Sequence, residues 1–233
     1  NVTDALSLTA GGRWTKEEKS IDIGILGSCE LDFSSCTNNA SNEKDWSNFS
    51  PKVSAQYQFT DDMMAYASWT RGFASGVFNA RAATLDAVGP TNPESVDSLE
   101  VGFKTSFLDG RGIFNIAYFQ ADYEDLILFV NNPCDDCGAS LINFNAGEAE
   151  ISGFEAEVQL QPVDGLRLEA SIGTVDPEFT NIKYFDANAD GVVDSKDNAL
   201  ASTWDFQKVA ELSYSVAGSY EMGMMGGGAL LTR

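Results

Sequence analysis

The residues best suited to chemistry lie in the stretch DANADGVVDSKD at 186–197. Its oxygen donors fall at the first, third, fifth, seventh, ninth and twelfth positions, and Gly191 stands sixth, where a calcium-binding loop turns sharply. Calcium prefers such oxygen ligands, and this spacing lets one loop wrap around the ion. The predicted ligands, with Val192 contributing its carbonyl, are Asp186, Asn188, Asp190, Val192, Asp194 and Asp197.

The last of these ligands departs from the usual pattern. Asp197 stands where such loops carry Glu, and its shorter side chain favours binding through one oxygen. The alternative interpretation is an acidic, turn-rich loop without a metal. A calcium switch is disfavoured because it needs paired flanking helices, and only 196–203 could form even a short one. We therefore expect structural calcium that fixes an exposed loop.

The four cysteines form two local pairs, Cys29 with Cys36 and Cys134 with Cys137. Each pair falls within a predicted long link, which favours local disulfides in an oxidising compartment. One alternative is a redox role for the second pair, although no helix follows it to lower a thiol pKa. The other is a four-thiolate zinc site, which would require the two links to meet.

The composition argues against catalysis and against nucleic-acid binding. The chain has no histidine, which removes the commonest general base, and it has neither a phosphate loop nor a nucleophile elbow. Its 35 acidic residues outnumber its 14 basic residues, giving a formal charge of −21. Phosphate contacts need clustered Lys and Arg. We expect a protein that is not an enzyme and binds no nucleic acid.

Four further residues lie where a predicted strand enters a long link: Arg71, Phe73, Phe78 and Arg81. Arginine beside aromatic rings suits a ligand that carries carboxylate or chelate charge. The competing interpretation, which the residue types favour, is packing in an aromatic girdle and within the link. The charged stretch at 15–20 is interpreted as a solvated loop.

Strands must position all of these residues. Apolar and polar residues alternate strictly over 48–60, which is the period of a strand with one apolar face. The same pattern predicts about nine strands near 4–15, 48–60, 63–74, 95–108, 112–130, 141–161, 165–175, 207–221 and 227–233.

The links between these strands alternate in length. Short turns containing Asp-Gly or Gly-rich sequences alternate with long links at 16–47, 75–94, 131–140 and 175–206. A soluble sandwich has no reason to gather its long loops at one end, whereas a transmembrane barrel has short periplasmic turns and long extracellular loops. No apolar run approaches the roughly 18 residues of a membrane-spanning helix. The chain also begins and ends within strand patterns, so we expect part of a larger protein.

Four blocks of the sequence resemble the barrel of TonB-dependent outer-membrane receptors. They are FSPKVSAQYQFTDDMMAYASWTRGFASGVFNAR (49–81), PESVDSLEVGFKTSFLDGR (93–111), IFNIAYFQADYEDLILF (113–129) and NAGEAEISGFEAEVQLQPVDGLRLEASIG (145–173). The resemblance implies an antiparallel barrel of about 22 strands closed by an N-terminal plug. Residues 1–233 would be a partial barrel, with the plug and the remaining strands outside this chain.

The resemblance also implies a function. Such receptors lie in the bacterial outer membrane and take up a scarce ligand, such as a ferric siderophore. Contact between the plug and the TonB complex supplies the energy. Two alternatives stay open: a passive porin or adhesin-like barrel, and a soluble, calcium-stabilised β-rich surface module.

Overall fold

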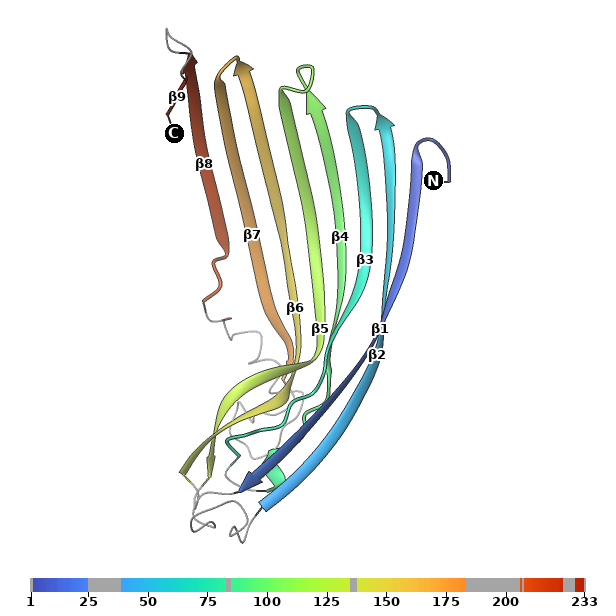
Figure 1. Cartoon of the computed structure of the whole chain (residues 1–233), viewed down its shortest axis with the longest axis vertical. Helices are drawn as coiled ribbons and strands as arrows, with labels where there is room; N and C mark the ends of the chain where they lie inside the picture. The colour runs from blue at the N-terminus through green and yellow to red at the C-terminus, as the bar shows by residue number, and fades with distance from the viewer. Residues whose placement is uncertain are drawn as a thin grey trace.

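The computed structural model describes residues 2–24, 39–82, 85–134, 138–182, 206, 208–223 and 229–232. Within them, nine strands form one antiparallel sheet in which each strand pairs with its neighbours along the chain (Figure 1). The strands are β1 (Leu6–Gly24), β2 (Asn39–Thr60), β3 (Met63–Ala74), β4 (Glu94–Phe107), β5 (Gly112–Cys134), β6 (Gly138–Val163), β7 (Leu166–Ile182), β8 (Leu212–Gly223) and β9 (Ala229–Thr232). The predicted all-β, antiparallel fold of about nine strands is confirmed.

The described residues contain one short 3-10 helix, η2 (Asp86–Val88), between β3 and β4. None of them forms a helix long and apolar enough to cross a membrane.

Tight turns join β2 to β3, β4 to β5 and β6 to β7 at one end of the sheet, drawn at the top of Figure 1. Gly110 and Gly165 both adopt φ 81° in these turns. Glycine enters that left-handed region without the steric cost that other residues meet. The Asp-Gly pairs therefore form the turns predicted from the sequence.

The strands extend further toward the opposite end than the alternation predicted. Residues 15–20, predicted to be a loop, lie within β1, so that prediction is wrong. The extension of β1 and β2 is polar on its outward face, whereas Ile21, Ile23 and Trp46 lie on the opposite face, and polar pairs between the strands stabilise it. Lys16 Nζ lies 3.6 Å from a carboxylate oxygen of Asp45, and Ser41 donates a 2.6 Å hydrogen bond to Asp22. Residues 15–20 contain no apolar residue, so hydrophobic periodicity could not reveal this part of the hairpin.

The same excess length appears elsewhere. The predicted link at 131–140 is largely strand, since β5 runs to Cys134 and β6 begins at Gly138. Similarly, β7 continues to Ile182. In the other direction, β8 begins at Leu212, five residues after the predicted start at 207.

The register gives the sheet one apolar and one polar face. Val53 pairs with Ala10 on one side and Trp69 on the other, and Trp69 pairs with Leu99. Because side chains alternate along strands, these residues share a face. The opposite face carries polar residues such as Lys52 and Ser68.

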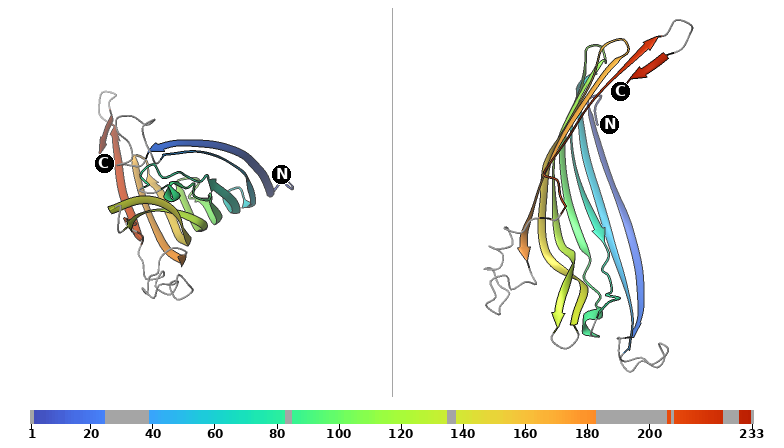
Figure 2. Two further views of the ribbon diagram at one scale, coloured as in Figure 1. Left: turned by 90° about the horizontal axis from the view of Figure 1, so that it is seen from below. Right: turned by 90° about the vertical axis from the view of Figure 1, so that its left-hand side faces the viewer.

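No second sheet covers the apolar face in the part of the chain that the structure describes. Its large side chains stay open, with Trp14 68% exposed and Phe154 55% exposed. Figure 2 shows a sheet that curves but does not close on itself. This arrangement differs from a sandwich, where a second sheet would bury such a face.

The few buried side chains gather away from the tight turns. Val88 is fully buried, and a small core forms around Ala149, Phe179 and Ile182. Phe179 stacks on Phe206 with ring centroids 4.2 Å apart. Packing is therefore concentrated at the end of the sheet where the long links lie.

Candidate functional site

The apolar face ends at a sharp boundary toward the long links. On β4, the apolar residues from Phe107 to Leu99 give way to Asp97, and on β3 Trp69 gives way to Arg71. We call the apolar part of this face the apolar band. Its width on β2, from Phe59 to Phe49, matches the roughly 9–11 residues with which a tilted strand crosses a bilayer. Aromatic residues at the boundary, typical of a membrane interface, are Trp14, Phe49 and Trp69.

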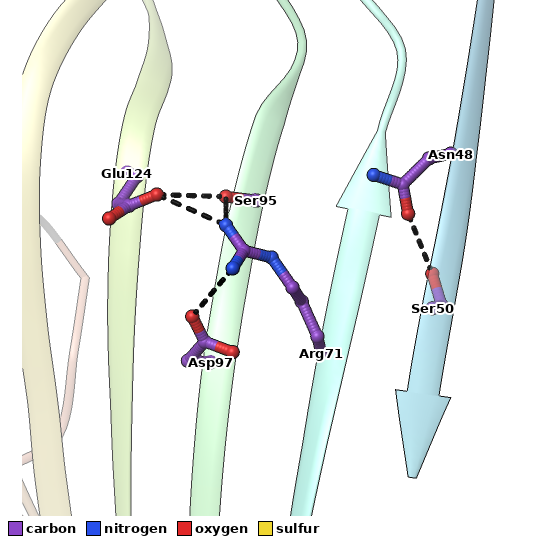
Figure 3. A network of polar contacts seen from close by, with 6 residues as sticks. All are labelled: Asn48, Ser50, Arg71, Ser95, Asp97 and Glu124. Carbon is purple, nitrogen blue, oxygen red and sulfur yellow. Dashed lines mark hydrogen bonds and ion pairs between the residues drawn. The ribbon is translucent and has the colours of Figure 1, made fainter. Parts of the chain in front are cut away.

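A polar cluster around Arg71 lies just beyond this boundary and joins three strands (Figure 3). Arg71 Nη2 donates a 3.2 Å hydrogen bond to Ser95 and lies 3.2 Å from a carboxylate oxygen of Glu124, while Nη1 lies 3.4 Å from Asp97. The side chain of Arg71 is 37% exposed, so water screens these ion pairs. The cluster connects β3, β4 and β5 on the outward face.

The link between β3 and β4 folds over the polar face. We call its described residues, 75–82 and 85–93, the strap. Ser75, Asn79, Val88 and Thr91 of the strap are all buried. Reciprocal backbone hydrogen bonds, 2.9 Å from Thr91 N to Val77 O and 2.8 Å from Asn79 N to Val88 O, hold its two limbs together.

One side of the strap rests on the β1–β2 hairpin. Ser75 donates a 2.6 Å hydrogen bond to Glu17, and Lys19 Nζ donates a 3.0 Å hydrogen bond to the carbonyl of Gly76. Phe78 meets Trp46 edge to face at 6.3 Å between centroids. The strap thus places polar and aromatic contacts on the same hairpin.

The other side rests on the β5–β6 hairpin. Asn79 Nδ2 donates a 3.0 Å hydrogen bond to the carbonyl of Asn143, and the backbone N–H of Asn143 donates a 2.6 Å hydrogen bond to Asn79 Oδ1. Asn92 and Asn145 form a similar pair, in which Asn92 N donates to Asn145 Oδ1 at 2.8 Å and Asn145 Nδ2 donates to Asn92 O at 3.0 Å. The strap therefore spans from one protruding hairpin to the other.

The structure does not bring the four predicted ligand-binding residues together. Arg71 and Phe73 lie on the outward face, by their pairing with Asp97 and Ser95. Phe78 and Arg81 belong to the strap, where Arg81 is exposed and Phe78 is half-buried. The polar contacts of Asn79 and Asn143 were not predicted, because they join residues 64 positions apart and carry no local sequence pattern.

The polar face nearer the tight turns forms a shallow hollow of about 410 Å³. Tyr66 donates a 2.5 Å hydrogen bond to Glu100, and Lys104 Nζ lies 5.5 Å from the centroid of the Tyr66 ring. Glu155 and Glu157 line the same hollow as Tyr66 and Lys104. Charged side chains of this kind are comfortable in a wet lumen.

The predicted calcium ligands at 186–197 lie outside the described residues. Cys29, Cys36 and Cys137 also lie outside them, and Cys134 is placed only as the last residue of β5. In the part of the chain that is described, no three His, Cys, Asp or Glu side chains are grouped so that they could hold a metal ion. The calcium and disulfide predictions therefore stay predictions.

A curved antiparallel sheet with an open apolar band outside and a polar face inside is part of a transmembrane β-barrel. The chain belongs to the family described as "TonB dependent receptor-like, beta-barrel", which matches residues 1–232. Proteins of this family lie in the outer membrane of Gram-negative bacteria. It is a family of receptors and transporters and not of enzymes.

Two relatives carry informative names. The chain is 26% identical over 235 residues to the ferripyoverdine receptor of Pseudomonas aeruginosa, covering 98% of this chain and 24% of that receptor. It is 30% identical over 145 residues to the ferric-pyoverdine M114 receptor PbuA of Pseudomonas sp. strain M114, covering 61% of this chain and 16% of that receptor. This chain thus spans about a quarter of the length of the first receptor.

Solved structures support the fold. The ferric yersiniabactin uptake receptor FyuA from Yersinia pestis matches with a TM-score of 0.70 at 17% identity, over 99% of this chain and 31% of that one. The pyoverdine receptor FpvA from Pseudomonas aeruginosa PAO1 matches with a TM-score of 0.59 at 21% identity, over 95% and 27%.

Proposed function

We propose that this chain is part of an outer-membrane receptor that takes up a ferric siderophore with energy from the TonB complex. The observation that supports this most is its likeness over 98% of its length to a ferripyoverdine receptor. The remaining strands and the plug would come from the rest of the receptor, and the plug would contact TonB. Lipid would surround the apolar band.

The test uses the full-length receptor in a host that lacks its own siderophore receptors. Uptake of radioactive iron from a panel of ferric siderophores, pyoverdines included, is measured with and without TonB. We expect uptake of at least one chelate and its loss when TonB is deleted. Uptake that persists without TonB would favour the passive porin, and a receptor that binds none of the chelates would contradict the proposal.

Within this function, we assign ligand contact to Phe78 and Arg81 in preference to Arg71 and Phe73. The strap residues lie over the polar face, which becomes the lumen when the barrel closes. Arg71 forms ion pairs with Asp97 and Glu124 on the outward face. We therefore assign it the role of connecting β3, β4 and β5. Separate Phe78→Ala and Arg71→Ala variants should therefore differ, with only the first weakening siderophore binding.

We also propose structural calcium in the loop at 186–197. The supporting observation is the regular spacing of oxygen donors from Asp186 to Asp197. Terbium luminescence or radioactive calcium binding to the full-length receptor should reveal the site. Asp190→Ala should abolish binding, whereas Asp61→Ala in a tight turn should leave it unchanged. Equal binding by both variants would contradict the assignment.

Finally, we propose disulfides between Cys29 and Cys36 and between Cys134 and Cys137. Two close pairs in extracellular parts of the chain, in an oxidising compartment, support them. Mass spectrometry of peptides alkylated before and after reduction should find both links in the native receptor. Free thiols at all four positions would contradict the proposal.

A further inference from the structure

The strap makes more contacts with the two neighbouring hairpins than a simple connection between β3 and β4 requires. The strap connects Ala74 of β3 to Glu94 of β4, and these two residues are paired neighbours in the sheet. Its path nevertheless reaches β1–β2 on one side and β5–β6 on the other. Because these hairpins protrude beyond the apolar band, lipid does not support them. Something else must hold them in place.

Asn79 is the central residue on the β5–β6 side. It is 5% exposed, and its amide both donates to the carbonyl of Asn143 and accepts from the backbone N–H of Asn143. Its Nδ2 also donates a 2.9 Å hydrogen bond to Ala87 O, across the strap. One buried side chain therefore joins both limbs of the strap to β6.

Lys19 and Ser75 provide the matching contacts on the β1–β2 side. Glu17, which accepts from Ser75, lies 3.8 Å from Lys19 Nζ, and Lys19 also lies 5.7 Å from the centroid of the Trp46 ring. Gly76 leaves no space for a side chain, because a Cβ there would collide with the carbonyl of Thr91 and come 2.8 Å from Trp46. The strap is therefore closely fitted at this side too.

We propose that the strap is a strut that fixes the distance between the β1–β2 and β5–β6 hairpins across the extracellular mouth. Asn79 is its positioning residue. These two hairpins keep their spacing when a ligand binds, and any extracellular element that closes on the ligand lies elsewhere. This last consequence rests on the proposed uptake function, whereas the strut itself does not.

The test measures the distance between the two hairpins in the full-length receptor by electron paramagnetic resonance. Spin labels are attached through a ketone-bearing amino acid at Glu43 and Phe129, both exposed, so that the native cysteines stay unlabelled. In the unaltered receptor we expect one narrow distance distribution. Asn79→Ala should broaden it, and Ala80→Ser, at the exposed neighbouring residue, should not.

A second variant shows whether the whole strap, and not only the surroundings of Asn79, sets the distance between the hairpins. It also keeps the test informative if Asn79→Ala fails to fold. The double substitution Lys19→Met with Ser75→Ala loosens the opposite side of the strap and should broaden the same distribution. Narrow distributions in folded receptors carrying either change would overturn the strut. A change of distance when the preferred ferric siderophore is added would overturn the fixed spacing, while failure of all chelates to bind would count against the uptake function alone.

Discussion

An arginine introduced into the apolar band tests the assignment of the two faces of the sheet. Val101 lies on the outward face of β4 between Leu99 and Phe103, and it pairs with Ala67 on β3 and Tyr118 on β5. Neither of these strand partners is charged. Val101→Arg would therefore place a charge in the hydrocarbon region of the bilayer.

The expected cost follows from the depth of the residue. Arginine near the bilayer midplane destabilises a barrel by about 2–4 kcal/mol, and near the interface by about 0–1 kcal/mol. The larger figure corresponds to a change of roughly 30- to 700-fold in the folding equilibrium constant. Gln120 pairs with Leu99 at the boundary, and its amide lies 3.3 Å from Asp122. Gln120→Arg should therefore fall in the smaller range.

The assay compares folded receptor in lipid vesicles as denaturant is increased, with the heat-modifiable gel mobility of the barrel as the readout. Ser68→Arg serves as the control at a similar level on the polar face, where it pairs across the strands with Glu100. We expect Val101→Arg to lose far more stability than Ser68→Arg. The reverse order, or equal losses, would refute the assignment of faces.

Three further substitutions test the turns, the strap and the polar cluster. Gly76→Ala should destabilise the strap by about 1–3 kcal/mol through overpacking and speed its proteolysis, whereas Gly11→Ala, which has open space, should not. Arg71→Met should cost only about 1 kcal/mol or less in denaturant unfolding, because its ion pairs are partly exposed, and the loss should shrink at high salt. Gly165→Ala should lower the free energy of unfolding more than Gly110→Ala. Both residues have φ 81°, so each substitution incurs a strain of about 1–2 kcal/mol. Only at Gly165 would the added Cβ also meet a carbonyl oxygen, that of Glu221, at 2.5 Å. A loss at Gly110 equal to that at Gly165 would show that strain alone decides.

The sequence was sufficient to predict the part of the sheet that carries the apolar band. A strand with one apolar and one polar face requires alternation, so the pattern at 48–60 predicted β2 there and also which of its residues face outward. The turns were equally readable, since Asp164 and Gly165 combine two residues that favour the required backbone.

The parts beyond the apolar band were not readable in the same way. Residues 15–20 of β1, past Trp14, are all polar or charged, and their strand character comes from pairing with β2. The strap has no periodic pattern, and its key contacts join Asn79 to Asn143 and Ser75 to Glu17 across long separations in sequence. Such contacts depend on a sheet that must already have formed.

The length of the strands connects these two parts. β6 has 26 residues, although a bilayer crossing needs only about 9–11. The excess lies beyond the apolar band, where no apolar face is selected and two-stranded ribbons alone are marginally stable. Hairpins that protrude in this way therefore need contacts that run between them. The strap supplies these contacts with the buried amide of Asn79 and a closely fitted glycine, Gly76. The buried polar residues among those described, Ser75, Asn79 and Thr91, all belong to this segment, although its sequence reads as a loop.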